Sequence, residues 1–151
     1  MAASEFHVTL TWTGNDGRGT SVRDHGTDGE LAAAGRPTIP TLAPRGGPDG
    51  WTPEHLLLGS VAQCHMLWYL HLCARNGVVV ETYEDAATCR LVVDGSAGSV
   101  QDVHLHASVG ISAGDPATAT QLFAVAGEKC YVARSLTSRV THDVDVRVLS
   151  P

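Results

Sequence analysis

Two of the four cysteines in this chain occur in very different sequence environments. Cys64 lies inside the apolar run 56–70, whereas Cys130 ends a second helical pattern. A cysteine attacks as the thiolate, and two thiols that meet can cycle between the dithiol and the disulfide. The pair therefore predicts a redox-active thiol couple.

The segment around Cys64 is predicted to be one long helix. Thr52 can cap its N-terminus, Pro53 suits the first helical position, and Gly77 ends the pattern. A helix this apolar must be buried. Helical spacing predicts that the Cys64 sulfur faces packed surface with a few polar openings, on the side that also carries Leu57, Ser60, Val61, Leu67, Trp68 and His71.

Cys73 lies on the same predicted helix but out of reach of Cys64. Nine helical steps turn roughly 180° beyond whole turns and rise about 13 Å, which is too far for a disulfide. Any disulfide to Cys64 must therefore come from a distant segment. We expect Cys73 and Cys89 to be structural, because free cysteine is among the most buried residue types.

Composition limits the classes of function. The chain has 151 residues, is 43% hydrophobic and is expected to form a single domain, 1–151. A net charge of -6 and a pI near 5.7 leave no basic stripe, which argues against nucleic acid or an anionic membrane as a partner.

The expected location is the cytoplasm. The first five residues lack the features of a secretory signal, and the longest apolar stretch is interrupted at 63–65 and is expected to be too short to span a bilayer. In a reducing compartment, four cysteines do not indicate a structural disulfide framework.

Apolar and polar residues alternate over 6–12, which predicts a strand, and the turn residues 14–17 predict a hairpin that returns over 20–25. The stretch 26–50 is expected to hold one short strand near 30–33 and otherwise to run as a surface loop. After the long helix, 78–93 and 100–111 are predicted to be two strands joined by a turn at 94–98.

Asp115 and Pro116 predict the start of a second helix, and the alternation over 140–148 predicts a closing strand. The inward residues of that helix should be Ala119, Leu122, Phe123 and Ala126. Strands, a long helix, more strands, a helix and a last strand describe an α+β architecture.

Two local motifs carry a resemblance to a known family. The first is residues 51–57, with Cys64 ten positions after Glu54, and the second is residues 128–136, which contain Cys130. Together with the order of elements over nearly the whole chain, they resemble the OsmC/Ohr family (osmotically inducible protein C-like organic hydroperoxide reductases). The resemblance implies an OsmC-like fold, an intertwined homodimer with two central helices and two interface active sites, and reduction of organic hydroperoxides.

The resemblance also implies roles for the two cysteines. Cys64 would be the attacking residue and Cys130 the resolving residue, and an external dithiol of the lipoyl or thioredoxin type would reduce the disulfide. No cofactor is expected. The apolar neighbours of Cys64 suit a substrate with a hydrocarbon tail; the predicted pocket consists of Leu57, Val61, Leu67, Trp68 and Tyr131.

Glu54 matches the family glutamate that pairs with an arginine beside the reactive sulfur. It also suits the first helical turn, where the dipole favours an acidic residue. Ten helical steps place it about 15 Å from Cys64 along one helix. We therefore expect that Glu54 serves Cys64 of the other subunit, or that the helix is broken between them.

The matching arginine should lie in the first hairpin. Arg23 is our choice, with Arg18 as the alternative, and neither stands in clear register with the motif. A guanidinium could stabilise the thiolate and orient the peroxide oxygens. A solvated strand arginine is an equally good reading of Arg23.

The chain departs from the family pattern at three positions. Tyr131 stands where the family usually has proline, and Gln63 and His65 flank Cys64 where small or apolar residues are usual. Adjacent residues on a helix do not face each other, so His65 is expected to be a core or interface histidine rather than a base for Cys64.

Eight histidines also raise the question of a metal site. His71 with Cys73, or His104 with His106, could each supply two ligands. No C-x-x-C pair or H-E-x-x-H motif is present, and alternate histidines on a strand occur often by chance, so no metal is expected.

A second class of function fits the same sequence. A non-catalytic OsmC-like protein could bind an apolar ligand at the dimer interface and use its cysteines to sense oxidation. The lack of a clearly placed arginine keeps this alternative open. An enzyme would consume many equivalents of peroxide, whereas a sensor would be oxidised once.

Overall fold

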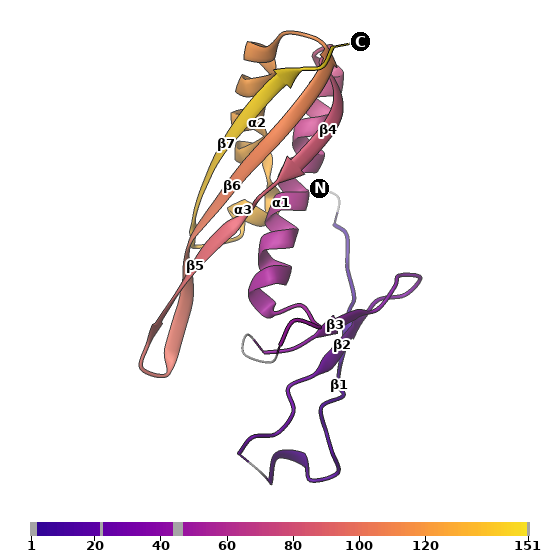
Figure 1. Cartoon of the computed structure of the whole chain (residues 1–151), viewed down its shortest axis with the longest axis vertical. Helices are drawn as coiled ribbons and strands as arrows, with labels where there is room; N and C mark the ends of the chain where they lie inside the picture. Colours follow the sequence, from indigo (N-terminus) through magenta and orange to yellow (C-terminus); the bar gives the residue numbers. More distant parts are fainter. Residues whose placement is uncertain (1–2, 22, 44–46, 151) are drawn as a thin grey trace. The chain divides into compact units, whose positions relative to one another are not determined.

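The computed structural model describes residues 3–21, 23–43 and 47–150 (Figure 1). The chain divides into two compact units, residues 1–56 and 57–151. The first unit contains a small sheet, and the second contains a larger sheet with helices. This mixed architecture confirms the α+β prediction.

The small sheet has three antiparallel strands in the order β1-β2-β3: β1 (Thr9–Trp12), β2 (Gly29–Ala32) and β3 (Ile39–Thr41). The strand expected near 30–33 is confirmed as β2. β3 falls inside the stretch that was expected to be loop. Its three residues are too few to give a sequence pattern, and Pro40 lies at its centre.

The predicted hairpin with a return strand at 20–25 is wrong. β1 pairs instead with β2, and Trp12 lies opposite Gly29. Residues 19–21 form a 3₁₀ turn, and Val22 lies outside the described residues. The side chain of Asn15 accepts hydrogen bonds from the backbone of Gly17 and Gly19, both at 2.9 Å, and so folds this segment into a local turn.

The long helix is confirmed as α1 (Pro53–Arg75). The hydroxyl of Thr52 accepts a hydrogen bond from the backbone N–H of His55 at 3.4 Å, which satisfies one free donor at the N-terminus. Gly77 follows the helix with φ 71°, the left-handed conformation that commonly ends helices.

By length and composition α1 could cross a membrane, with 23 residues and a mean hydropathy of 1.2 in its 18-residue window. The expectation that the apolar stretch is too short is therefore wrong. A core helix of a soluble protein has the same properties, and one line of α1 packs into the core: Val61, His65, Tyr69 and Cys73.

The larger sheet is built around the 17-residue strand β6 (Ala97–Ala113). β4 (Val79–Asp85) and β5 (Thr88–Asp94) pair antiparallel with different halves of it, and β7 (Arg139–Val148) pairs parallel to it. The stretch 78–93, predicted as one strand, is thus interrupted at Ala86, whose N–H donates to the His106 carbonyl at 3.0 Å. The predicted closing strand is confirmed as β7.

α2 (Pro116–Lys129) begins after Asp115, whose carboxylate accepts a hydrogen bond from the Thr118 N–H at 2.8 Å. Its buried residues are those predicted: Ala119, Leu122, Phe123 and Ala126. The short helix α3 (Tyr131–Arg134) follows after a single intervening residue, Cys130.

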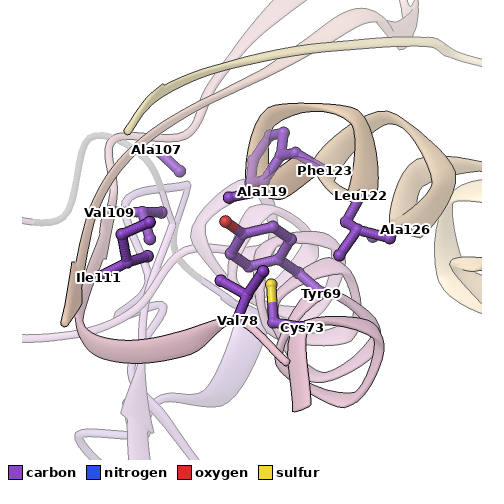
Figure 2. Packing of buried hydrophobic residues seen from close by; sticks show 10 residues of the cluster. All are labelled: Tyr69, Cys73, Val78, Ala107, Val109, Ile111, Ala119, Leu122, Phe123 and Ala126. Atoms are coloured by element: carbon purple, nitrogen blue, oxygen red, sulfur yellow. The ribbon is translucent and has the colours of Figure 1, made fainter. Parts of the chain in front are cut away.

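Two clusters of buried side chains hold the second unit together. In the larger cluster, Tyr69 of α1 packs edge-on against Phe123 of α2, with ring centroids 5.2 Å apart, close to the β6 side chains (Figure 2). The smaller cluster joins Val61 of α1 to Val103 and Leu105 of β6. These contacts fix the middle of α1 against the sheet.

Candidate active site

Cys130 occupies the junction between α2 and α3. It ends α2 and caps α3, and its sulfur accepts a hydrogen bond from the Ala133 N–H at 3.4 Å. The same sulfur lies 3.9 Å from the carbonyl oxygen of Val61 on α1. The sharp change of direction between the helices thus points this thiol, which is fully buried, toward α1.

The Cys64 thiol lies one turn of α1 beyond Val61 and interacts with the Cys130 thiol. Cys64 is partly buried, because it flanks the buried line of α1 instead of belonging to it. The two sulfurs come from distant segments, as the sequence predicted for any partner of Cys64. Both cysteines are free thiols in the structure.

The two thiols differ in environment. Burial raises the pKa of Cys130 to about 11, and the neighbouring Cys64 adds to this shift against the opposing hydrogen bond from Ala133. Cys130 is therefore a protonated thiol at neutral pH and a poor first nucleophile. The accessible member of the pair is Cys64.

The surroundings of the thiol pair are apolar. Val61 lies in the cluster that also receives Val132 and Ala133 from α3. Partly buried side chains of α1 pack against the same cluster, namely Leu58 and Ala62. This setting suits a hydrocarbon group better than a strongly hydrated one.

The residues predicted to form the substrate pocket are differently exposed in the single chain. Val61 is buried, Leu57 and Trp68 are partly buried, and Leu67 and Tyr131 are 58% and 66% exposed. The rings of Trp68 and Tyr131 meet edge to face at 5.5 Å. Their role as a substrate pocket stays a prediction.

A shallow surface pocket of about 340 Å³ beside Cys130 includes two cations that the sequence analysis missed. Lys129 and Arg134 line it together with Trp68, Tyr131 and Glu128. The Lys129 ammonium lies 5.8 Å from the centre of the Trp68 ring. The available signal was their position in the sequence, since Lys129 directly precedes Cys130 and Arg134 follows it one helical turn later.

Glu54 lies in the first turn of α1, which is continuous from Pro53 to Arg75. A break in the helix between Glu54 and Cys64 is therefore excluded, and the version with Glu54 serving the other subunit stays a prediction. Arg18 donates to the Asp16 carboxylate in its own turn. Arg23 lies in a turn, not in the strand predicted for it.

Cys73 is buried in the larger core cluster, where burial raises the pKa of its thiol. Cys89 is partly buried on β5 and packs against the smaller cluster. These positions agree with structural roles. The two cysteines that the structure brings together are thus the two that the local sequence patterns singled out.

Comparison with known proteins decides the family. A family model described as OsmC-like protein matches residues 46–145, which include Glu54, Cys64 and Cys130. The chain belongs to the OsmC-like family. This confirms the resemblance seen in the sequence, whereas no curated protein matches the chain.

Solved structures support the OsmC-like fold. An OsmC-like protein of unknown function from Vibrio cholerae has a TM-score of 0.85 at 23% identity, covering 95% of this chain and 100% of that chain. An organic hydroperoxide resistance protein from Elizabethkingia anophelis has a TM-score of 0.69 at 14% identity, covering 98% of this chain and 99% of that chain. An organic hydroperoxide resistance protein from Legionella pneumophila has a TM-score of 0.67 at 17% identity, covering 98% of this chain and 100% of that chain.

His65, one of the departures from the family pattern, is a core histidine in this OsmC-like protein. Its Nε2 lies 3.0 Å from the Phe123 carbonyl oxygen, and its ring packs 4.2 Å from the Phe123 ring. Burial, aided by the nearby His142, lowers the pKa of His65 to about 4. It is therefore neutral at pH 7 and hydrogen-bonded to α2, as expected for a residue that does not act on Cys64.

Proposed function

We propose that this OsmC-like protein is a thiol-dependent peroxidase that reduces organic hydroperoxides to alcohols. The observation that carries the proposal is the interaction between a partly buried thiol, Cys64, and a fully buried, protonated thiol, Cys130. The family and two structural relatives named organic hydroperoxide resistance proteins support it.

The reaction has two thiol steps. The Cys64 thiolate attacks the outer oxygen of R–O–O–H, the O–O bond breaks, and the products are the Cys64 sulfenic acid and an alkoxide that takes up a proton as the alcohol. The Cys130 sulfur, after losing its proton, then attacks the Cys64 sulfur and displaces water, forming the disulfide. A dithiol of the lipoyl or thioredoxin type reduces that disulfide and is itself oxidised.

The burial of Cys130 supports Cys64 as the thiol that attacks first. Cys130 has no exposed surface and a pKa near 11, so a substrate from solvent meets Cys64. The sulfenic acid on Cys64 then forms beside the Cys130 thiol. The apolar surroundings from Val61, Val132 and Ala133 favour a peroxide with a hydrocarbon group over hydrogen peroxide.

The proposal includes a homodimer. Helix α1 is apolar, yet only one line of it is buried in the chain, and Leu67 on another side is 58% exposed. A second copy could cover this surface and bring its Glu54 to Cys64. The cytoplasm, where thiols are kept reduced, is the proposed location.

The non-catalytic alternative rests on one observation. Arg18 is engaged by Asp16, and Arg23 lies in a turn instead of the predicted return strand, so neither arginine is held in a first hairpin, where the family resemblance expects it. An OsmC-like protein without that cation could bind an apolar ligand and be oxidised once.

Dithiol-dependent consumption of an organic hydroperoxide, with hydrogen peroxide measured in parallel, separates the two functions. The wild type should turn over many equivalents with preference for the organic substrate, and Cys64→Ser should abolish turnover. Cys89→Ser, which changes another partly buried cysteine, is the matched control and should retain it. A single stoichiometric oxidation of the wild type would favour the sensor.

A further inference from the structure

The outer face of the larger sheet carries a group of side chains that the thiol chemistry does not use. Along β6, Val103, Leu105 and Ala107 are buried, so His104 and His106 point to the opposite face. β7 runs parallel beside β6 (Figure 1), and its register places Asp143 opposite His106.

Three donor atoms from these residues converge. The Nε2 of His104 lies 3.2 Å from a carboxylate oxygen of Asp143, and the Nδ1 of His106 contacts the other oxygen. One ligand atom from each residue lies within 4.8 Å of the others. A tetrahedral zinc ion with bonds of about 2.1 Å holds its ligands about 3.4 Å apart, so small side-chain adjustments would suffice.

The Nδ1 of His104, the ring nitrogen that does not face Asp143, has a partner that orients the ring for metal binding. The Thr141 hydroxyl lies 3.4 Å from the Val103 carbonyl, to which it donates, and 2.9 Å from the His104 Nδ1. Because its hydrogen is used by Val103, the hydroxyl oxygen accepts from Nδ1–H. With Nδ1 protonated in this way, Nε2 is the nitrogen that would bind a metal ion, once the ion replaces the proton through which Nε2 pairs with Asp143.

His106 has the complementary arrangement. With Nδ1 directed at Asp143, its Nε2 lies 3.6 Å from a carboxylate oxygen of Asp145. A carboxylate beside the second nitrogen is a common support for histidines that bind zinc, because it orients the ring and increases its basicity. Both histidines are thus oriented by neighbours outside the ligand set.

The local charge favours a cation. Asp145 adds a second carboxylate, and Asp85 accepts a hydrogen bond from the backbone N–H of His106 at 3.1 Å. The nearby guanidinium groups of Arg90 and Arg139 are bound to Asp102. The three ligand side chains are 41%, 45% and 56% exposed, so an ion can reach them from solvent.

We propose that His104, His106 and Asp143 form a binding site for a divalent transition metal, Zn²⁺ being the best match. Two imidazole nitrogens select zinc-like ions over Mg²⁺ or Ca²⁺, which prefer oxygen ligands. Three protein ligands leave a fourth position for water. The ion would bridge β6 and β7 on the face opposite the thiol pair.

Binding of Zn²⁺ to the untagged, reduced full-length protein tests the site. Equilibrium dialysis gives the affinity, and imidazole ¹⁵N resonances give the location. We expect binding of Zn²⁺ to shift the signals of His104 Nε2 and His106 Nδ1. His106→Ala and Asp143→Asn should each weaken binding by more than about tenfold, and Thr141→Val by about tenfold through loss of ring orientation.

His71→Ala, which removes an exposed histidine of α1, is the matched control and should leave the affinity unchanged. Cys64→Ser tests the thiols as an alternative zinc site and should also leave it unchanged. The proposal is overturned if the wild type takes up no Zn²⁺, if His106→Ala and Asp143→Asn bind as the wild type does, or if Cys64→Ser removes the binding. Peroxide consumption is not part of this readout, so the site and the proposed activity can fail independently.

Discussion

The sulfur of Cys130 lies 3.9 Å from the carbonyl oxygen of Val61, one turn of α1 before Cys64. This contact holds the junction between α2 and α3 against the turn that ends at Cys64. An oxidised Cys64 would therefore form next to a second thiol without any need for a distant segment to arrive. We therefore expect the two cysteines to act in different steps of the reaction, and each step can be measured separately.

Cys130→Ser should separate the first step of the reaction from the second. Attack by Cys64 on the hydroperoxide needs no second thiol, so one equivalent of peroxide should still be consumed. The sulfenic acid on Cys64 should then persist, because nothing displaces its hydroxyl group. Trapping with a sulfenic-acid reagent and mass spectrometry measures this product. Wild-type rates of dithiol-dependent turnover in Cys130→Ser would rule out the resolving role.

Alkylation should follow the exposure of the thiols. Cys64 is partly buried and should react first with a small alkylating reagent, whereas Cys73 and Cys130 are buried and should react slowly. Because burial raises the pKa of Cys130 to about 11, its alkylation should accelerate as pH rises toward that value. Peptide mapping over time gives each rate, with denatured protein as the control. Faster labelling of Cys130 than of Cys64 at neutral pH would contradict the proposed order.

Much of the second unit could be predicted because its patterns are long and periodic. The cap and proline at the start of α1, the inward residues of α2 and the alternation of β7 each satisfy one local rule that agrees with the fold. Cys64 and Cys130 could be singled out for a similar reason, since each lies in a distinctive local motif. Their proximity was implied by the family resemblance.

The errors occur where distant pairing decides the structure. Turn residues after β1 suggested a hairpin, but the Asn15 side chain folds that segment locally and β1 pairs with β2. β3 is too short to give a pattern. Asp143 could not be placed beside His104 and His106 from the sequence, because the parallel register of β6 and β7 joins residues far apart in the chain.

The buried His65 should make stability depend on pH. Its pKa is about 4 in the folded protein against the ordinary histidine pKa of 6.5, so between these values the unfolded chain binds more protons. The free energy of unfolding should therefore rise with pH from 4 to 6.5, by about 3 kcal/mol from this residue. Denaturant titrations at several pH values measure the slope.

His65→Gln can still donate to the Phe123 carbonyl but does not titrate, so its slope over this range should be flatter. His71→Gln, at an exposed position of α1, should behave as the wild type. An equal slope for His65→Gln and the wild type would show that other groups cause the pH dependence.

The cap of α2 should contribute measurably to stability. Asp115→Ala removes the carboxylate that accepts from Thr118, leaving a helix donor unsatisfied, and should lower Tm by about 3 °C. Asp115→Asn keeps an acceptor oxygen at the same place, so its Tm should fall by less. Thermal unfolding followed by circular dichroism compares the variants. Equal Tm values for Asp115→Ala and the wild type would mean that the cap contributes little.

We expect the oligomeric state to depend on the exposed side of α1. Leu67 is 58% exposed in the single chain, and a buried position in a dimer would make a charge there costly. Sedimentation analysis should therefore give the wild type about twice the 15.9 kDa chain mass, and Leu67→Glu should shift it toward the monomer.

Val93→Glu places the same charge on an apolar residue of β5 that is 65% exposed, and it should remain a dimer. If Leu67→Glu does not fold, the wild type still provides a test, because the Tm of a dimer rises with protein concentration. A wild-type chain that sediments as a monomer with a concentration-independent Tm would remove the dimer, and with it the expectation that Glu54 of one subunit serves Cys64 of the other.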